Sequence, residues 1–164
     1  MAERQLVQAL YNFQINTAGG KLQVWPNAAA GVAVTSGATV FGAWTQLLAA
    51  GVVPNPTYIA GIIPSSPTAP TANEEYRIDL ATGAAGAEIS LSSGSITPQG
   101  LAGLGLNFTS VTAAGELAYP IPGIRLPFLK VVGSPRIAAA VAELLVGGTT
   151  IKLALITWTP ATAV

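Results

Sequence analysis

The chain has 164 residues, of which 51% are apolar, and it carries 7 basic and 7 acidic side chains but neither histidine nor cysteine. The two absences exclude a Ser-His-Asp nucleophile system, a disulfide framework, and most zinc, copper, haem and iron–sulfur sites. The balanced charge removes the electrostatic footprint of a nucleic-acid-binding protein, and we therefore expect no nucleic acid as a partner.

The distribution of charge is more unusual than its amount. No charged residue occurs between Lys21 and Glu74. A surface with so few charged residues is expected to be covered by other subunits, so the sequence indicates a protein that functions by assembly rather than by catalysis. The charge-free stretch 28–53 is long enough to cross a membrane, but it contains four glycines together with threonine and glutamine. We therefore expect strands there and no membrane partner.

Residues 1–20 are predicted to form an N-terminal arm. Residues 6–10 are compatible with a helix, and residues 11–16 alternate polar side chains with Tyr11, Phe13 and Ile15, which predicts a strand. A turn at 18–20 then leads into a strand over 22–25, which Pro26 ends.

The next third of the chain is expected to contain three strands. The first covers 32–35 and is broken at Ser36-Gly37, and the second covers 39–49 with a bulge at Gly42. A third covers 58–63. The proline-rich run 64–73 is interpreted as a long surface connection.

The clearest alternation in the chain lies between residues 75 and 92. In the run 75–80 the charged residues Glu75, Arg77 and Asp79 alternate with large apolar ones, and the run 87–92 alternates in the same way. Two half-buried runs joined by a glycine-containing loop predict a hairpin. We expect its polar side chains, Asp79, Glu88 and Ser90 among them, to face solvent and Ile89 to face the core.

The C-terminal part is again predicted to be strand and turn. Apolar residues with interrupting glycines fill 101–111, and the run 124–132 contains Pro127, which predicts an edge or bulged strand. Residues 136–145 have helical propensity, but Gly147-Gly148 joins them to the alternating run 149–158, so we expect two strands in a hairpin. Eight to ten short strands predict an all-β, single-domain jelly roll or β-sandwich over 21–164.

Few residues carry a recognisable pattern for chemistry. Glu75 and Asp79 share a strand face, as a glycosidase pair would, but Arg77 between them favours a structural interpretation. Glu74 and Asp79 lack the further acids of a calcium loop, and no lysine has the spacing of a Ser-Lys dyad. We therefore expect no enzyme activity, no cofactor, and no catalytic or metal-binding residue.

Several segments resemble strands of jelly-roll virion proteins of tailed bacteriophages. They cover most of residues 40–158, and the match is best to the small decoration (cement) proteins that coat capsids. The segments are Phe41-Gly-Ala-Trp-Thr-Gln-Leu-Leu-Ala-Ala, Tyr58-Ile-Ala-Gly-Ile, Tyr119-Pro-Ile-Pro-Gly-Ile-Arg-Leu-Pro, Gly133-Ser-Pro-Arg-Ile-Ala-Ala-Ala-Val and Thr149-Thr-Ile-Lys-Leu-Ala-Leu-Ile-Thr.

The resemblance implies a homotrimer on the capsid surface of a virion, with an arm that reaches a neighbouring trimer or the major capsid protein. No catalytic residue transfers, because the family has none. Decoration proteins of thermophilic phages belong to this group, and a single methionine with no cysteine suits a thermostable chain.

Five residues are candidates for contacts between subunits: Tyr11, Phe13, Ile15, Trp25 and Trp44. The alternative hypothesis is a carbohydrate- or receptor-binding sandwich of a phage tail, neck or head fibre, in which Trp25 and Trp44 would form the binding platform.

Overall fold

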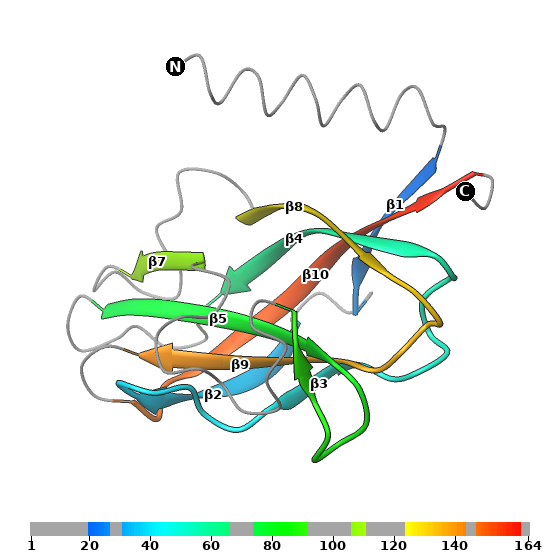
Figure 1. Ribbon diagram of the computed structural model, residues 1–164. Helices are drawn as coiled ribbons and strands as arrows, with labels where there is room; N and C mark the ends of the chain where they lie inside the picture. Colours follow the sequence, from blue (N-terminus) through cyan, green and yellow to red (C-terminus); the bar gives the residue numbers. More distant parts are fainter. Residues whose placement is uncertain are drawn as a thin grey trace, which may run out of the picture.

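The computed structural model describes residues 20–26, 31–65, 74–91, 106–110, 124–143 and 147–161. These residues form ten strands and no helix, which confirms the all-β prediction (Figure 1). No helix in the described ranges is long and apolar enough to cross a membrane. In chain order the strands are β1 (Gly20–Trp25), β2 (Val32–Ala38), β3 (Thr45–Leu48), β4 (Thr57–Ser65), β5 (Glu74–Thr82), β6 (Ile89–Ser90), β7 (Leu106–Ser110), β8 (Ile124–Val131), β9 (Ile137–Glu143) and β10 (Thr150–Pro160).

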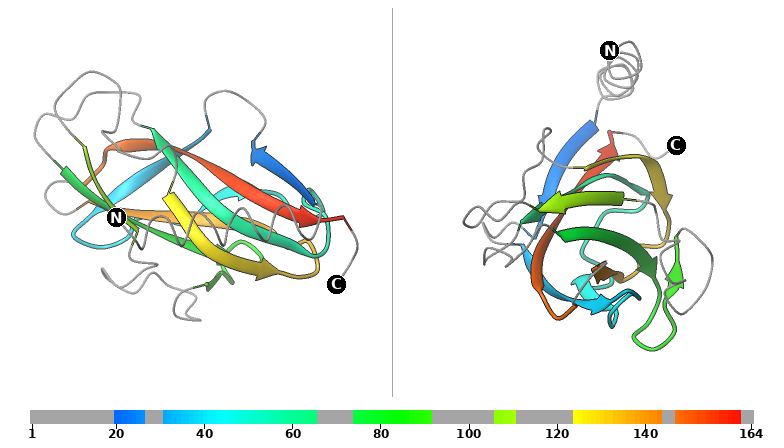
Figure 2. Two further views of the ribbon diagram at one scale, coloured as in Figure 1. Left: turned by 90° about the horizontal axis from the view of Figure 1, so that it is seen from above. Right: turned by 90° about the vertical axis from the view of Figure 1, so that its left-hand side faces the viewer.

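The ten strands belong to one curled sheet with the order β6-β5-β9-β2-β10-β4-β8. Three further strands join this path from the side: β1 pairs with β10, β3 with β9 and β7 with β5. All of these pairs are antiparallel except β2 with β9, which is parallel. We call β1, β10, β4 and β8 the β10 half, and β9, β5, β3, β6 and β7 the β9 half. Figure 2 shows how the sheet curls, so that the two halves face each other.

Strand β2 joins the two halves. Its residues 32–35 pair with β10, and its residues 36–38 pair with β9. The predicted break at Ser36-Gly37 is therefore wrong, because this dipeptide lies where the strand changes partner and stays in the sheet. Gly37 suits that position, since a Cβ on it would lie 2.4 Å from the carbonyl oxygen of Val40.

The core lies between the two halves. Ile59 and Leu153 come from the β10 half, Tyr76 and Val141 from the β9 half, and all four side chains are fully buried. Each such side chain contributes about 1.5–3 kcal/mol through removal of apolar surface from water. The predicted alternation in β5 is confirmed on this side, because Ile78 and Leu80 are buried there as well.

The opposite face of β9 is also covered, by the segment 39–44. Phe41 packs on Ala140 and Ala142 of β9, and Trp44 packs against the same cluster. The predicted strand over 39–49 is thus shorter than expected, since only β3 is strand and residues 41–44 lie across the face of β9. Gly42 permits this close approach: its N–H donates to the carbonyl of Val141 at 2.9 Å, and a Cβ on it would lie 2.6 Å from the carbonyl oxygen of Thr35.

The hairpin of β5 and β6 forms as predicted, but its solvent face does not. Ala81 pairs with Ser90, while Asp79, Ser90 and Glu88 are buried and Ile89 is 52% exposed. The expected solvated face of Asp79, Glu88 and Ser90 is therefore wrong. Asp79 of β5 accepts a hydrogen bond from Ser90 of β6, and Glu88 pairs with Arg136, so these polar side chains are bonded to protein partners instead of solvated.

The glycine pair near the C-terminus does not close the predicted hairpin. β9 and β10 are both strands, as expected, but in the described residues each pairs with β2 and neither pairs with the other. The N–H of Gly148 donates to the carbonyl of Ser36, and the N–H of Ser36 donates to the carbonyl of Thr149. The turn at Gly147-Gly148 is thus hydrogen-bonded to β2, and β2 lies between β9 and β10.

Of two further predictions, one is confirmed and the other falls on residues outside the described ranges. β8 contains Pro127 and ends the sheet order, so the edge-strand prediction is confirmed. The arm over 1–20 stays a prediction, because residues 1–19 lie outside the described residues and Gly20 already belongs to β1. The same holds for residues 66–73 of the proline-rich run and for residues 101–105 and 111 of the region 101–111.

Candidate functional site

The structure places the two predicted tryptophan contacts in different halves of the sheet. Trp25 ends β1, is half-buried against the main core, and donates from Nε1 to Oγ1 of Thr157 at 2.9 Å. Trp44 is half-buried against the cluster on the outer face of β9. Tyr11, Phe13 and Ile15 lie outside the described residues. The predicted contact residues are therefore not brought together in the described structure.

Glu143 is one of three carboxylates that the described structure places in the interior. Its side chain is 1% exposed and sits where β2 passes between the two halves. Oε2 accepts a hydrogen bond of 2.6 Å from Oγ of Ser36, and Oε1 accepts one of 2.8 Å from Oγ1 of Thr149. The backbone N–H of Thr149 lies 3.4 Å from Oε2. This carboxylate is thus fully engaged in joining β2 and β9 to the turn before β10.

Glu88 forms an ion pair with Arg136 at 2.8 Å. Burial raises the pKa of Glu88, but hydrogen bonds from its own backbone N–H, from Arg136 and from the N–H of Gly86, together with the positive charge of Arg136, outweigh this effect and hold the pKa below its ordinary value. Arg136 also donates to Oε1 of Gln46 at 3.1 Å. The pair therefore fastens the turn before β6 to the start of β9 and to β3.

Asp79 completes the set, with Oδ2 accepting a 2.7 Å hydrogen bond from Ser90 and Oδ1 accepting one from the N–H of Leu80. The three acids are held apart by their separate partners, and no group of acidic residues in the described ranges could hold a metal ion. What these carboxylates do in the described structure is bind neighbouring strands.

A consequence appears on the surface. Every carboxylate whose side chain is described is buried, whereas Lys21 and Lys130 are exposed and Lys152 is half-buried. The charge that the described surface shows to solvent is therefore cationic and sparse, although the whole chain is neutral.

The β10 half carries an apolar outer face. By the strand register, Val24 lies opposite Ile156, and Ala154 lies opposite Ile63. Leu22 and Val24 are 41% and 46% exposed, and Ile156, Ala154 and Ile63 are half-buried. We call these five residues the outer apolar face. The indole of Trp158 adjoins it and contacts Tyr58, with the ring centroids 5.2 Å apart.

The two edges of the β10 half differ in kind. β8 carries Pro127, and its register with β4 shifts between Ile59 and Gly61. Both features discourage the addition of another strand. β1 pairs with β10 through six consecutive residue pairs without a shift, and β10 is its only partner in the described structure. β1 therefore presents a straight, regular edge beside β10 (Figure 1).

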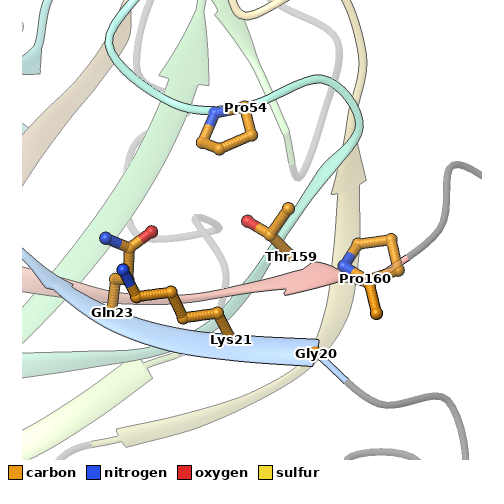
Figure 3. Close-up of a pocket in the computed structure, with 7 residues that line it drawn as sticks. Gly20, Lys21, Gln23, Pro54, Thr159 and Pro160 are labelled. Atoms are coloured by element: carbon orange, nitrogen blue, oxygen red, sulfur yellow. The ribbon is translucent and has the colours of Figure 1, made fainter.

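A shallow hollow of about 380 Å³ lies on the inner side of β1. Figure 3 shows Lys21 and Gln23 of β1 on one side of it, Thr159 and Pro160 of β10 at its end, and Pro54 across from them. None of the described residues that line it is aromatic, and Lys21 is the only titratable side chain among them. The described lining therefore holds no acid–base pair.

Leu22 and Val24 were missed among the candidate contacts from sequence. The signal was present, because the alternation in 20–25 places these two side chains on one face and Lys21, Gln23 and Trp25 on the other. Sequence reasoning selected Trp25 for its size, but that side chain turns toward the core.

The fold and the surface define an all-β protein of one curled sheet whose most distinctive surface is an apolar sheet face beside the β1 edge, with which no described strand pairs. Comparison of the chain with protein-family models, with curated proteins and with solved structures finds no significant match in any of the three.

Proposed function

We propose that this chain is a structural protein of a bacteriophage virion that decorates the capsid surface, associates as a homotrimer and bridges subunits of the major capsid protein. The observation that carries the proposal is the outer apolar face, on which Leu22 and Val24 are exposed beside three half-buried apolar side chains. The resemblance of residues 40–158 to decoration proteins supports the virion as the location.

The physics of a permanent contact fits such a surface. Stable interfaces bury about 1,600 Å² in total, and their centres are depleted of charge. The outer apolar face has no carboxylate among its described side chains, and Lys130 and Lys152 belong to strands β8 and β10 of the same half. Lysines at the rim of an apolar contact favour a partner surface with acidic groups at the matching rim.

The use of carboxylates inside the protein supports the same proposal. Asp79, Glu88 and Glu143 each bind side chains of neighbouring strands or turns, which leaves them no free oxygen aimed at a cleft. A protein that works through contact area needs a rigid body, and these buried bonds supply rigidity in the β5–β6 hairpin and, through Glu143, where β2 changes partner.

The alternative of a sugar-binding module receives less support. A sugar ring stacks on an exposed aromatic face. The hollow beside β1 has no aromatic residue in the described part of its lining, and Trp25 is half-buried with its Nε1 bonded to Thr157.

The test uses purified chain and capsids from which the decoration layer has been removed. We expect a native mass of three chains, saturable binding to the capsids, and particles that withstand heating better when coated. Val24→Glu should weaken capsid binding or trimer formation at least tenfold. Ile89→Glu, equally exposed but on β6 of the other half, should change neither.

A chain that remains monomeric and does not bind capsids would contradict the proposal. So would equal losses from the two glutamate variants, because the outer apolar face would then have no special part in the contact. Circular dichroism of both variants confirms that each still folds.

A further inference from the structure

We propose that the outer edge of β1, with which no described strand pairs, pairs antiparallel with β1 of a second copy, about a two-fold axis through Gln23, so that the two sheets continue into each other. The inference builds on the proposed self-association, and the two-fold contact is separate from the threefold contacts of a trimer. On a shell it would connect one trimer to the next.

The first argument is the state of the edge itself. An unpaired strand edge presents a row of N–H and C=O groups to any strand that can reach it, and natural proteins guard such edges with proline, bulges or charge. The β8 edge has such guards, whereas β1 has an unbroken register, no proline within it and one charged residue, Lys21. The difference indicates that the β1 edge is meant to be paired.

The second argument is the register. In a continuous sheet, residues opposite each other point to the same face, so the two paired positions must sum to an even number. An axis at Gln23 meets this condition and pairs the segment 21–25 with itself. Leu22 then lies opposite Val24 of the second copy, and Val24 lies opposite its Leu22. Four exposed apolar side chains gather on one face as a result.

The third argument is charge. The same axis sets Lys21 opposite Trp25 of the second copy, so the two Lys21 ammonium groups do not face each other. The two Lys21 residues lie four strand positions apart, about 13 Å along the strand, where their repulsion is screened. An axis at Leu22 would halve the distance between the two Lys21 residues along the strand. An axis at Val24 would leave Lys21 without a paired residue in the second copy.

The absence of cysteine makes a clean test possible, because each introduced thiol is the only one in the chain. Gln23→Cys places two thiols directly opposite each other at the axis, where a disulfide can form. In a glutathione redox buffer at low protein concentration, we expect a covalent dimer. Val24→Cys alone should not cross-link, since its two Cα atoms would lie about 8 Å apart across the axis.

Two controls complete the experiment. A mixture of Leu22→Cys and Val24→Cys chains should give the mixed dimer, because these positions face each other. Ile89→Cys, which is 52% exposed on the β9 half, measures random collision. We expect Gln23→Cys to exceed it in dimer yield at least tenfold.

No cross-link from Gln23→Cys in the full chain, or a yield equal to that of Ile89→Cys, would overturn the inference, and it would show that the chain's own N-terminal residues or another partner covers the edge. A trimer that binds capsids without the Gln23 cross-link would leave the proposed function intact. A cross-linked dimer that never binds capsids would leave the β1 pairing intact and remove the function.

Discussion

The hydroxyl of Ser36 donates a 2.6 Å hydrogen bond to the buried carboxylate of Glu143, between residues 107 positions apart in the chain. Ser36 lies where β2 leaves β10 and begins to pair with β9. Thr149, in the turn before β10, bonds the other carboxylate oxygen. One side chain thus fastens three segments at the only parallel pairing between described strands, a place where the ladder itself changes partner.

Replacing Glu143 by alanine should lower the free energy of unfolding by about 2–4 kcal/mol, because it leaves the hydroxyls of buried Ser36 and half-buried Thr149 without their acceptor and opens a cavity. Glu143→Gln keeps the volume and one carbonyl oxygen, and it should cost less than half as much. Chemical denaturation with urea measures both. Equal costs for the two variants would show that the second acceptor oxygen, rather than the filled volume, decides stability at this site.

The ion pair of Glu88 with Arg136 predicts a pH dependence of stability. The folded protein holds the pKa of Glu88 below its value in the unfolded chain, so the unfolded state binds the proton more readily. The stabilisation is therefore complete above the unfolded pKa of about 4.3 and is lost as the pH falls through the lowered folded value. Glu88→Gln should cost about 2 kcal/mol at neutral pH and remove this part of the acid dependence. Thermal unfolding of both proteins at pH 3 to 7 tests it, and parallel curves would contradict the assignment.

Gly20 is predicted to accept no larger residue. A Cβ on Gly20 would lie 2.2 Å from Nε1 of Trp158 and 2.6 Å from the carbonyl oxygen of Thr159. Gly20→Ala should therefore displace the indole or loosen β1 from β10, at a cost of about 1–3 kcal/mol, with a shift in tryptophan fluorescence. Trp158→Phe removes the obstructing nitrogen, so the same change should cost less in that background. If a double-mutant cycle of Gly20→Ala and Trp158→Phe gave no coupling free energy, the steric conflict between residue 20 and Trp158 would be refuted.

Ala140 lies between β9 and the segment that crosses it. It is fully buried beneath Phe41, with Trp44 against the same cluster. Ala140→Leu should lower stability by about 1–3 kcal/mol, because the added atoms meet a packed aromatic layer. Ala154→Leu makes the same change at a half-buried position on the outer apolar face, and it should cost under about 0.5 kcal/mol. Thermal unfolding compares the two, and similar losses would mean that the segment 39–44 does not seal the face of β9.

The sequence by itself determined where several of the strands form. The alternation of 75–80, the run 149–158 and the edge position of the segment with Pro127 were all readable, because side-chain period and the missing N–H of proline act over a few residues. The absence of histidine and cysteine likewise restricts the reactions and metal sites that the chain can support, whatever its fold. For the candidate site, the alternation in 20–25 already separates Leu22 and Val24 from Lys21.

Tertiary structure alone decided which strands are neighbours and which faces of the sheet are buried. Gly147-Gly148 looked like a hairpin turn, yet β2 inserts between β9 and β10, and strand order depends on contacts far apart in the chain. Glu88 and Ser90 read as solvated, yet they are enclosed in the β9 half, where the segment 39–44 covers the neighbouring strand β9. Burial of a strand face depends on what another segment lays over it, and no local pattern records that partner.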